Sequence, residues 1–297
     1  MPTVTGHLRI GCPVWACADW RGSLYTRAAE RKDYLPQYAS VFSTVEGNSS
    51  FYALPSPNAV ARWRAETPSS FRFCFKFPSD ITHRLMLRNA RAETHAFLKL
   101  MSPLEERLGP LMLQLGPRFG PQGLDTLRAF LRELPGAWHY AVEVRHPAFF
   151  DHGPDEAALN DLLRERGADR VLFDTRCVHA APAQDRSTGQ AQARKPLLPA
   201  RNTVTGTRPL LRFVGQNDVS QADAYLDEWS ELIAQWLQTG LKPYCFTHTP
   251  DDRHAPELAR MLHDRIRARL PALASLPTFP GESQRVGQPA AGQLALF

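Results

Sequence analysis

The sequence contains few cysteines and none of the spacings by which cysteines commonly bind zinc or form redox pairs. The five cysteines stand at positions 12, 17, 74, 177 and 245. An odd number without a CxxC pair is typical of reduced thiols in a cytoplasmic protein, with a metal site on Cys12 and Cys17 as the weaker alternative. A basic segment followed by an apolar one is missing at the start, and no run approaches about 18 apolar residues. We therefore predict a cytoplasmic protein without an export signal or a membrane span.

Sequence motifs that identify common enzyme classes are absent as well. The chain has no HExxH, GxSxG or P-loop pattern, and the segment GCPVWACADWRG in and after the first apolar run lacks GxGxxG. These absences argue against zinc proteases, α/β-hydrolases, P-loop nucleotide hydrolases and a dinucleotide-binding sheet. No cofactor is indicated, and no complete set of metal ligands is predicted.

Eight apolar runs recur along the chain at the spacing of β/α units. Hydrophobic residues make up 43% of the 297 residues and charged residues 22%, which is ample for a sizeable core. The runs start 29 to 39 residues apart and occupy residues 8–15, 41–51, 71–77, 110–115, 139–146, 170–175, 209–215 and 242–249. Helical patterns separate most of them, for example at 92–108 and 223–239. We therefore predict an α/β fold, a closed (β/α)8 TIM barrel that forms a single domain over residues 1–269.

The excess of positive charge lies in one segment, residues 176–208. The chain has 35 Lys and Arg against 30 Asp and Glu, and this segment holds six basic residues against one acidic residue. It is longer than an ordinary β/α connection, so we predict a flexible basic insertion after the sixth strand. Such a segment suits a nucleic acid, because neutralising phosphates releases counterions. The alternative is a segment that is charged only for solubility.

Ionisable residues near the carboxyl ends of the predicted strands are the candidates for chemistry, because the active sites of such barrels lie at that face. Charges within apolar strands must pair with one another or face a ligand. The candidate acids and bases are Glu46, Glu143, Asp174 and His146, and these groups are alternatively metal ligands. The candidates for ligand binding are Trp15, Asn48, Tyr52, Lys76, His83, Gln114, Arg145, Arg212 and His248. The cations among them suit phosphate or carboxylate, and the aromatic rings suit a sugar or a base.

Six ordered segments carry a resemblance to a known family. They are GCPVWACADWRGSLY, TVEGNSSFYALPSP, FRFCFKFPSDITH, LMLQLGPRF, AVEVRHPAFF and LLRFVG, within residues 8–268. Together they resemble the YecE-like proteins, the family of domain of unknown function seventy-two. The resemblance implies a TIM-barrel fold but no reaction, and it adds Trp20, Tyr25, Phe51 and Thr82 to the recurring positions. Members commonly read GTSGW at the first segment, RFHG where this chain has Val214, and paired Asn where it has Thr247 and His248.

The last five residues, QLALF, end a stretch with few apolar residues. From about residue 270 the Pro and Gly content predicts a flexible tail, residues 270–297. The pentapeptide resembles the one by which bacterial replication and repair proteins bind the DNA polymerase sliding clamp, through Gln293, Leu294, Leu296 and Phe297. Apolar anchors of an extended peptide enter a preformed groove, so we predict the clamp as a partner. The alternative is a tail that docks onto its own barrel.

Three functions remain open from the sequence. The first is an enzyme, a hydrolase or lyase, that acts on nucleic acid or on a nucleotide-derived phosphate and is tethered to the clamp. The second is a small-molecule enzyme, for example a hydrolase or isomerase of a sugar phosphate, and the third is a non-catalytic adaptor. Cations beside the carboxylates favour an anionic substrate over a glycoside.

Overall fold

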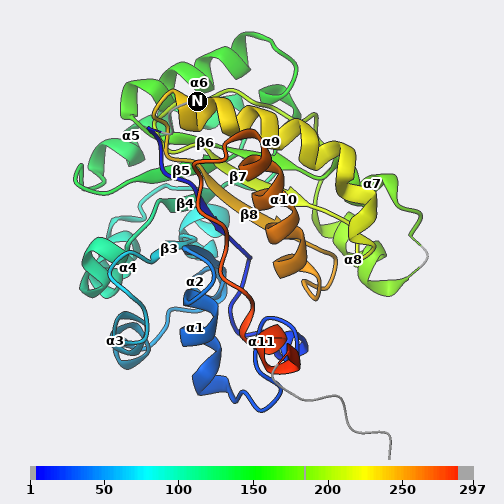
Figure 1. Cartoon of the computed structure of the whole chain (residues 1–297). Coiled ribbons are helices and arrows are strands. Elements are labelled where there is room, and N and C mark those ends of the chain that lie inside the picture. The colour runs from blue at the N-terminus through cyan, green and yellow to red at the C-terminus, as the bar shows by residue number, and fades with distance from the viewer. Residues whose placement is uncertain (1–4, 184, 287–297) are drawn as a thin grey trace, which may run out of the picture.

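Helices and strands alternate along the chain in the computed structural model, which describes residues 5–183 and 185–286 (Figure 1). The pentapeptide at 293–297 lies outside the described residues. The strands are β1 Arg9–Gly11, β2 Thr44–Gly47, β3 Arg72–Phe75, β4 Leu111–Gln114, β5 Tyr140–Glu143, β6 Asp169–Asp174, β7 Leu210–Val214 and β8 Tyr244–His248. The helices are α1 Arg31–Ala39, α2 Ser49–Tyr52, α3 Pro57–Ala65, α4 Arg91–Met101, α5 Leu124–Glu133, α6 Pro154–Arg166, α7 Arg176–Ala180, α8 Arg186–Arg194, α9 Asp223–Gln238, α10 Ala255–Arg269 and α11 Pro280–Val286.

The strands belong to two parallel sheets and not to one closed barrel. A curled, open sheet of six strands has the order β1-β8-β7-β6-β5-β4, and β2 pairs with β3 in a small second sheet. Each of the eight apolar runs gives one strand, which confirms the alternation of strands and helices. The prediction of a closed (β/α)8 TIM barrel is wrong, because the hydrogen-bonded ladder is interrupted between β1 and β2 and between β3 and β4.

A side chain bridges β1 and β2 where a backbone ladder would otherwise run. The Tyr38 hydroxyl accepts a hydrogen bond from the backbone N–H of Cys12 at 2.6 Å and donates one to the carbonyl of Thr44 at 2.9 Å. Pro13 follows and has no N–H to donate. One backbone bond, from the N–H of Glu46 to the carbonyl of Cys12 at 3.1 Å, remains between these segments.

A slip in register interrupts the ladder between β3 and β4. Phe73 pairs with Leu108 and Lys76 with Met112 as isolated bridges. Three residues of advance along β3 therefore match four residues of advance along the segment that leads into β4. The extra residue falls around Pro110, which cannot donate to a ladder. An extra residue of this kind bends a strand as a β-bulge does. The two sheets therefore remain adjacent without forming a continuous ladder.

Two segments predicted to be flexible contain regular structure. In the basic segment, α7 and α8 form, and the Asp185 carboxylate accepts the N–H of Thr188 at 2.9 Å at the start of α8. In the predicted tail, Phe279 is buried against Phe42, and α11 lies beside the N-terminal part of the chain (Figure 1). The prediction of flexible structure therefore does not hold for these helices. None of the helices within residues 5–183 and 185–286 is both long and apolar enough to cross a membrane.

Side chains on the inner face of the strands form layers, because residues two apart on a strand share a face. The middle layer is apolar and closely packed. It consists of Cys74, Met112, Ala141, Val171, Leu210, Tyr244 and Phe246. The next inward positions toward the carboxyl ends carry charged and polar side chains, apart from Phe173 on β6. An apolar layer thus supports the polar cluster at the carboxyl ends.

Candidate functional site

Arg212 on β7 lies at the centre of a buried charge cluster. Its Nε and Nη2 donate to Oε2 and Oε1 of Glu46 at 2.7 and 2.9 Å, and its Nη1 donates to Oε2 of Glu143 at 2.6 Å. The two carboxylates are fully buried and the arginine is 4% exposed. The planar guanidinium thereby joins the second strand to the fifth and seventh through paired, charge-assisted bonds.

Lys76 and His248 contact the same carboxylate from neighbouring strands. The Lys76 Nζ lies 3.2 Å from Oε1 of Glu46 and donates to Oε1 of Gln114 at 2.9 Å. Nε2 of His248 lies 3.3 Å from Oε2 of Glu46. Side chains from the ends of three other strands thus converge on Glu46.

Arg145 and Phe173 complete the cluster on the other side. Nε of Arg145 donates to Oε1 of Glu143 at 2.8 Å. The guanidinium carbons of Arg145 and Arg212 lie 5.2 and 4.8 Å from the centre of the Phe173 ring. Cations at this distance over an aromatic face are attracted to it. The ring therefore supports both guanidinium groups without neutralising them.

The pKa values separate ionised groups from groups that titrate near neutral pH. Burial alone would raise the pKa of Glu143, but Arg212, Arg145 and Lys76 outweigh burial and hold it at about 2. The pKa of Glu46 is likewise held well below its usual value by Arg212, Lys76 and His248 against the effect of burial. Burial lowers the pKa of Lys76 to about 8 and that of His248 to about 4. Both carboxylates are therefore ionised and His248 is neutral at pH 7.

A cavity of about 310 Å³ opens above this cluster, and the charged residues of its wall are mainly cations. Lys76, Arg145 and Arg212 line it, whereas Glu46 and Glu143 are not among the lining residues. Tyr52, which is 82% exposed, and Asn48 lie along the same wall. The carboxylates therefore hold the cations from beneath and leave cationic surface toward the cavity.

The structure adds three charged groups that sequence reasoning missed: Arg194, Lys195 and Asp252. Burial raises the pKa of Asp252 to about 6, against the effect of Lys195, and burial lowers the pKa of Lys195. Oδ1 of Asp252 is buried and has no hydrogen-bond partner among the described residues. Arg194 and Lys195 belong to the basic segment 176–208, whose excess of positive charge could have indicated them. Asp252 lies in the loop just after the eighth strand. It would have been a candidate if the residues of these loops had been considered along with the strand ends.

Asp174 lies away from the cavity. Its carboxylate accepts bonds from Nε and Nη2 of Arg176 at 3.0 and 2.8 Å and from Nε1 of Trp229 at 2.8 Å. Phe173 faces the cavity, and consecutive residues on a strand point to opposite faces. The hypothesis that Asp174 shares one rim with Glu46 therefore does not agree with the geometry.

The other predicted residues lie around the cavity rather than in it. Nδ1 of His146 accepts the N–H of Ala148 at 3.2 Å, which fixes this ring at a helix start outside the cavity lining. His83 contacts Thr82 at 3.0 Å and lines a small neighbouring hollow of about 50 Å³. Trp15 packs edge-on against Trp63, with ring centres 5.3 Å apart, and lines an adjoining cavity of about 570 Å³ that also includes Glu46 and Asn48.

The side chains of the metal-ligand alternative lie in different places. His83 and His146 do not line the cavity of Lys76 and Arg212. Within the described part of the chain, no group of three or more His, Cys, Asp and Glu side chains is arranged to hold a metal ion. What the cluster offers is a set of cations held in place by ionised carboxylates.

Comparisons with known proteins agree on one family. The chain matches the family described as "Protein of unknown function DUF72" over residues 9–283. It is 43% identical over 274 residues to the UPF0759 protein YecE of Escherichia coli K12. The aligned region covers 92% of this chain and 98% of that protein. The same values hold for the UPF0759 protein YecE of Escherichia coli O157:H7.

Solved structures support the fold. A DUF72 family protein from Thermotoga maritima has a TM-score of 0.66 at 23% identity, covering 89% of this chain and 99% of that one. A DUF72 family protein from Enterococcus faecalis has a TM-score of 0.65 at 20% identity, covering 92% and 100%. The resemblance to the YecE-like proteins is thus confirmed, and the chain belongs to the DUF72 family.

Proposed function

We propose that the cavity at the carboxyl ends of the strands binds a small phosphate-containing anion. The observation that carries this proposal is the composition of its wall. The cationic side chains that line it are Lys76, Arg145, Arg194, Lys195 and Arg212, and Asp252 is the one carboxylate among the described lining residues. Convergent cations in a partly desolvated hollow produce a positive potential that attracts anions.

The size of the cavity and its rings favour a compact ligand. A volume of about 310 Å³ falls at the lower end of the range for small-molecule sites. Phe51 and Phe173 line the wall and supply apolar faces for the part of a ligand that carries no charge. Phosphate oxygens match the fork of Arg145 and the point charge of Lys195.

The basic segment supports a small anion more than a nucleic acid strand. Arg176 is paired with Asp174 and with Glu228 at 2.9 Å, so its charge is balanced within the chain. Arg201 is paired with Glu156 at 2.8 Å. In contrast, Arg194 and Lys195 line the cavity. The segment thus directs Arg194 and Lys195 to this cavity and does not present all of its charge on an open surface.

Groups other than the predicted carboxylates Glu46 and Glu143 would transfer protons at this site. Glu46 and Glu143 are ionised and engaged by Arg212, so they position cations. Asp252 and Lys76, with pKa values of about 6 and 8, titrate near neutral pH, which is the range that a general acid or base requires. If the protein catalyses a reaction on the anion, we propose Asp252 as the group that exchanges the proton.

A Lys195→Ala variant tests the binding proposal. We expect it to bind inorganic phosphate at least about tenfold more weakly than the native chain, because one charge-assisted contact contributes about 1.5–3 kcal/mol. Isothermal titration calorimetry at fixed low salt measures the affinity. The matched control is Lys99→Ala, which removes the same charge from an exposed position on α4. Equal loss in both variants, or no loss in Lys195→Ala, would contradict the proposal.

Attachment to a sliding clamp is a second proposal, and the sequence of the pentapeptide favours it. We expect Phe297→Ala to weaken binding to a purified bacterial clamp at least about tenfold, because aromatic anchors dominate peptide recognition. Surface plasmon resonance with immobilised clamp measures this change, and Gln288→Ala is the control outside the motif. Undiminished binding of the Phe297→Ala variant, or no binding of the native chain, would remove the clamp as a partner.

A further inference from the structure

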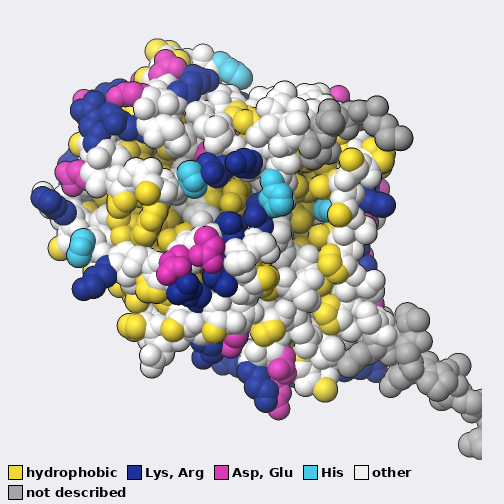
Figure 2. Space-filling view, turned by 60° about the vertical axis from the view of Figure 1, so that its left-hand side comes forward, with side chains coloured by type: hydrophobic (Ala, Val, Ile, Leu, Met, Phe, Trp, Pro, Cys, Tyr) yellow, Lys and Arg dark blue, Asp and Glu magenta, His cyan; other side chains and the backbone are white. Residues whose placement is uncertain are grey.

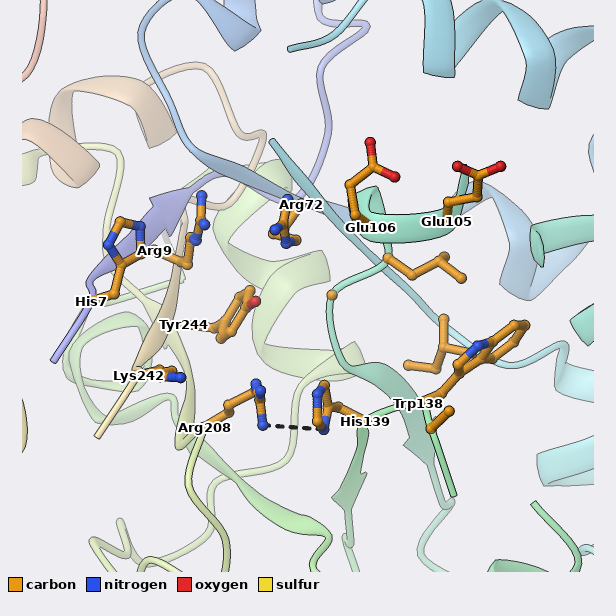
Figure 3. A pocket seen from close by; sticks show the side chains of 14 residues that line it. His7, Arg9, Arg72, Glu105, Glu106, Trp138, His139, Arg208, Lys242 and Tyr244 are labelled. Atoms are coloured by element: carbon orange, nitrogen blue, oxygen red, sulfur yellow. Dashed lines mark hydrogen bonds between the residues drawn. The ribbon is translucent and has the colours of Figure 1, made fainter. Parts of the chain in front are cut away.

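A second cavity lies at the opposite, amino-terminal ends of the strands. It measures about 420 Å³ and is lined by residues that begin or precede six of the eight strands. Figure 3 shows Arg9, Arg72, Arg208 and Lys242 around this cavity, with His7 and His139 beside them. On the face shown in Figure 2, Lys, Arg and His side chains gather around a hollow near its centre.

The four cations of this cavity, Arg9, Arg72, Arg208 and Lys242, have no carboxylate partner of their own. Arg9 and Arg72 are held by backbone carbonyls, with Nη1 of Arg72 donating to Ser69 at 2.7 Å. Within the described residues, no ion pair joins any of the four to a carboxylate. This arrangement differs from the other end of the strands, where Glu46 and Glu143 balance Arg212.

The carboxylates nearest to this cavity are already engaged. Glu105 and Glu106 line one edge, but each forms an ion pair at 2.6 Å, with Arg64 and with Arg107 respectively. Asp169 is buried and accepts the backbone N–H of Arg208 at 2.8 Å. Partly buried cations without a counterion are costly, and a bound anion would remove that cost.

The two cavities are separated by the apolar middle layer. Arg72, Cys74 and Lys76 alternate on one face of β3 and its continuation, and the outer two reach different cavities. Four residues along a strand span roughly 13 Å. Tyr244 and Phe246 of the same layer lie between Lys242 and His248 on β8. No residue lines both cavities among those described, so the second is a site of its own.

We propose that this amino-end cavity binds a small phosphorylated molecule that carries at least two negative charges. Cations placed on several sides of one hollow require more than one anionic group to satisfy them. The ring of Tyr244 and the indole of Trp138 line the cavity and provide faces for an uncharged part of the ligand (Figure 3). The volume of about 420 Å³ suits a compact ligand better than a nucleic acid strand.

The pKa values of the two histidines agree with a positive potential in this cavity. Burial lowers the pKa of His139, and Arg208 and Lys242 lower it further. The pKa of His7 is lowered by burial and then by Arg9, Arg72 and Lys242. Protonation is thus disfavoured by the same cations that would attract an anion.

Calorimetric titration with inorganic pyrophosphate tests this proposal. Lys242 is exposed, and its side chain has no hydrogen bond to any described residue, so Lys242→Ala and Lys242→Glu leave the fold intact. We expect pyrophosphate binding at this site to weaken about tenfold in Lys242→Ala and about a hundredfold in Lys242→Glu. Lys99→Glu is the control for the change in net charge, and circular dichroism verifies the fold of each variant.

The Lys195→Ala variant separates this proposal from the one for the carboxyl-end cavity. Two pyrophosphate sites are expected in the native chain, with one lost in Lys242→Glu and the other in Lys195→Ala. If the Lys242 variants bind as the native chain does while Lys195→Ala does not, the amino-end proposal is overturned and the carboxyl-end proposal stands. If a single-stranded oligonucleotide displaces pyrophosphate and itself depends on Lys242, the ligand is a nucleic acid and the proposed class is wrong.

Discussion

An Arg212→Met variant is expected to lose about 3–5 kcal/mol of its free energy of unfolding. The substitution removes the guanidinium that engages Glu46 and Glu143, both fully buried, and leaves Lys76 and Arg145 as their remaining cationic partners. Removing one partner of a buried ion pair costs this much because the remaining charge stays desolvated. Urea denaturation at pH 7, followed by circular dichroism, measures the change.

Two comparison variants make this prediction specific. Arg64→Met breaks the Arg64–Glu105 pair, whose side chains are 42% and 56% exposed, and should cost less than about 1 kcal/mol. Arg212→Lys keeps the charge but not the fork, so its loss should be smaller than that of Arg212→Met. If Arg212→Met were as stable as the native chain, the buried cluster would not be an ionised assembly held by this residue.

The contribution of Glu143 to stability is expected to depend strongly on pH. Its pKa of about 2 in the folded state lies below the value of about 4.3 in an unfolded chain. A carboxylate whose pKa is lower in the folded state stabilises the fold at pH values above its pKa in the unfolded chain. This stabilisation is lost as the pH falls toward the pKa of the folded state. The shift corresponds to about 3 kcal/mol at pH 7, of which about half remains at pH 3.

Glu143→Gln provides the measurement of this effect. The difference in free energy of unfolding between the native chain and this variant should shrink between pH 7 and pH 3, as measured by urea titration at each pH. Glu165→Gln is the control, because the Glu165 side chain is 47% exposed beside Arg166 and its substitution should have a small effect at every pH. A difference for Glu143→Gln that stayed constant with pH would contradict the ionised, paired state.

The convergence of charges could be read from the sequence because it depends on a simple periodicity. Glu143 and Arg145 lie two residues apart, at the end of β5 and just beyond it, and therefore share a face. The same rule, applied to Phe173 and Asp174, would have placed the carboxylate on the opposite face from the ring. The structure shows this arrangement, with Asp174 bonded to Trp229.

The open ladder and the loop residues of the site could not be derived in the same way. Closure depends on whether hydrogen-bond registers match across each pair of strands, and the slip around Pro110 becomes apparent only when both strands are placed. Lys195 and Asp252 reach the cavity from loops, whose paths no periodicity determines. Strand periodicity therefore places Glu46, Lys76 and Arg212 at one rim, but Asp174 was assigned to the wrong face and the loop residues were not covered.

The bridge made by Tyr38 assigns an architectural role to a helix. This phenol is fully buried on α1 and packs against Phe42 at 5.1 Å between ring centres. Because its single oxygen spans the gap between β1 and β2, the position of α1 sets how far apart the two sheets stand. Repacking this one helix would thus widen or narrow the interior, while every strand keeps its length and its partners.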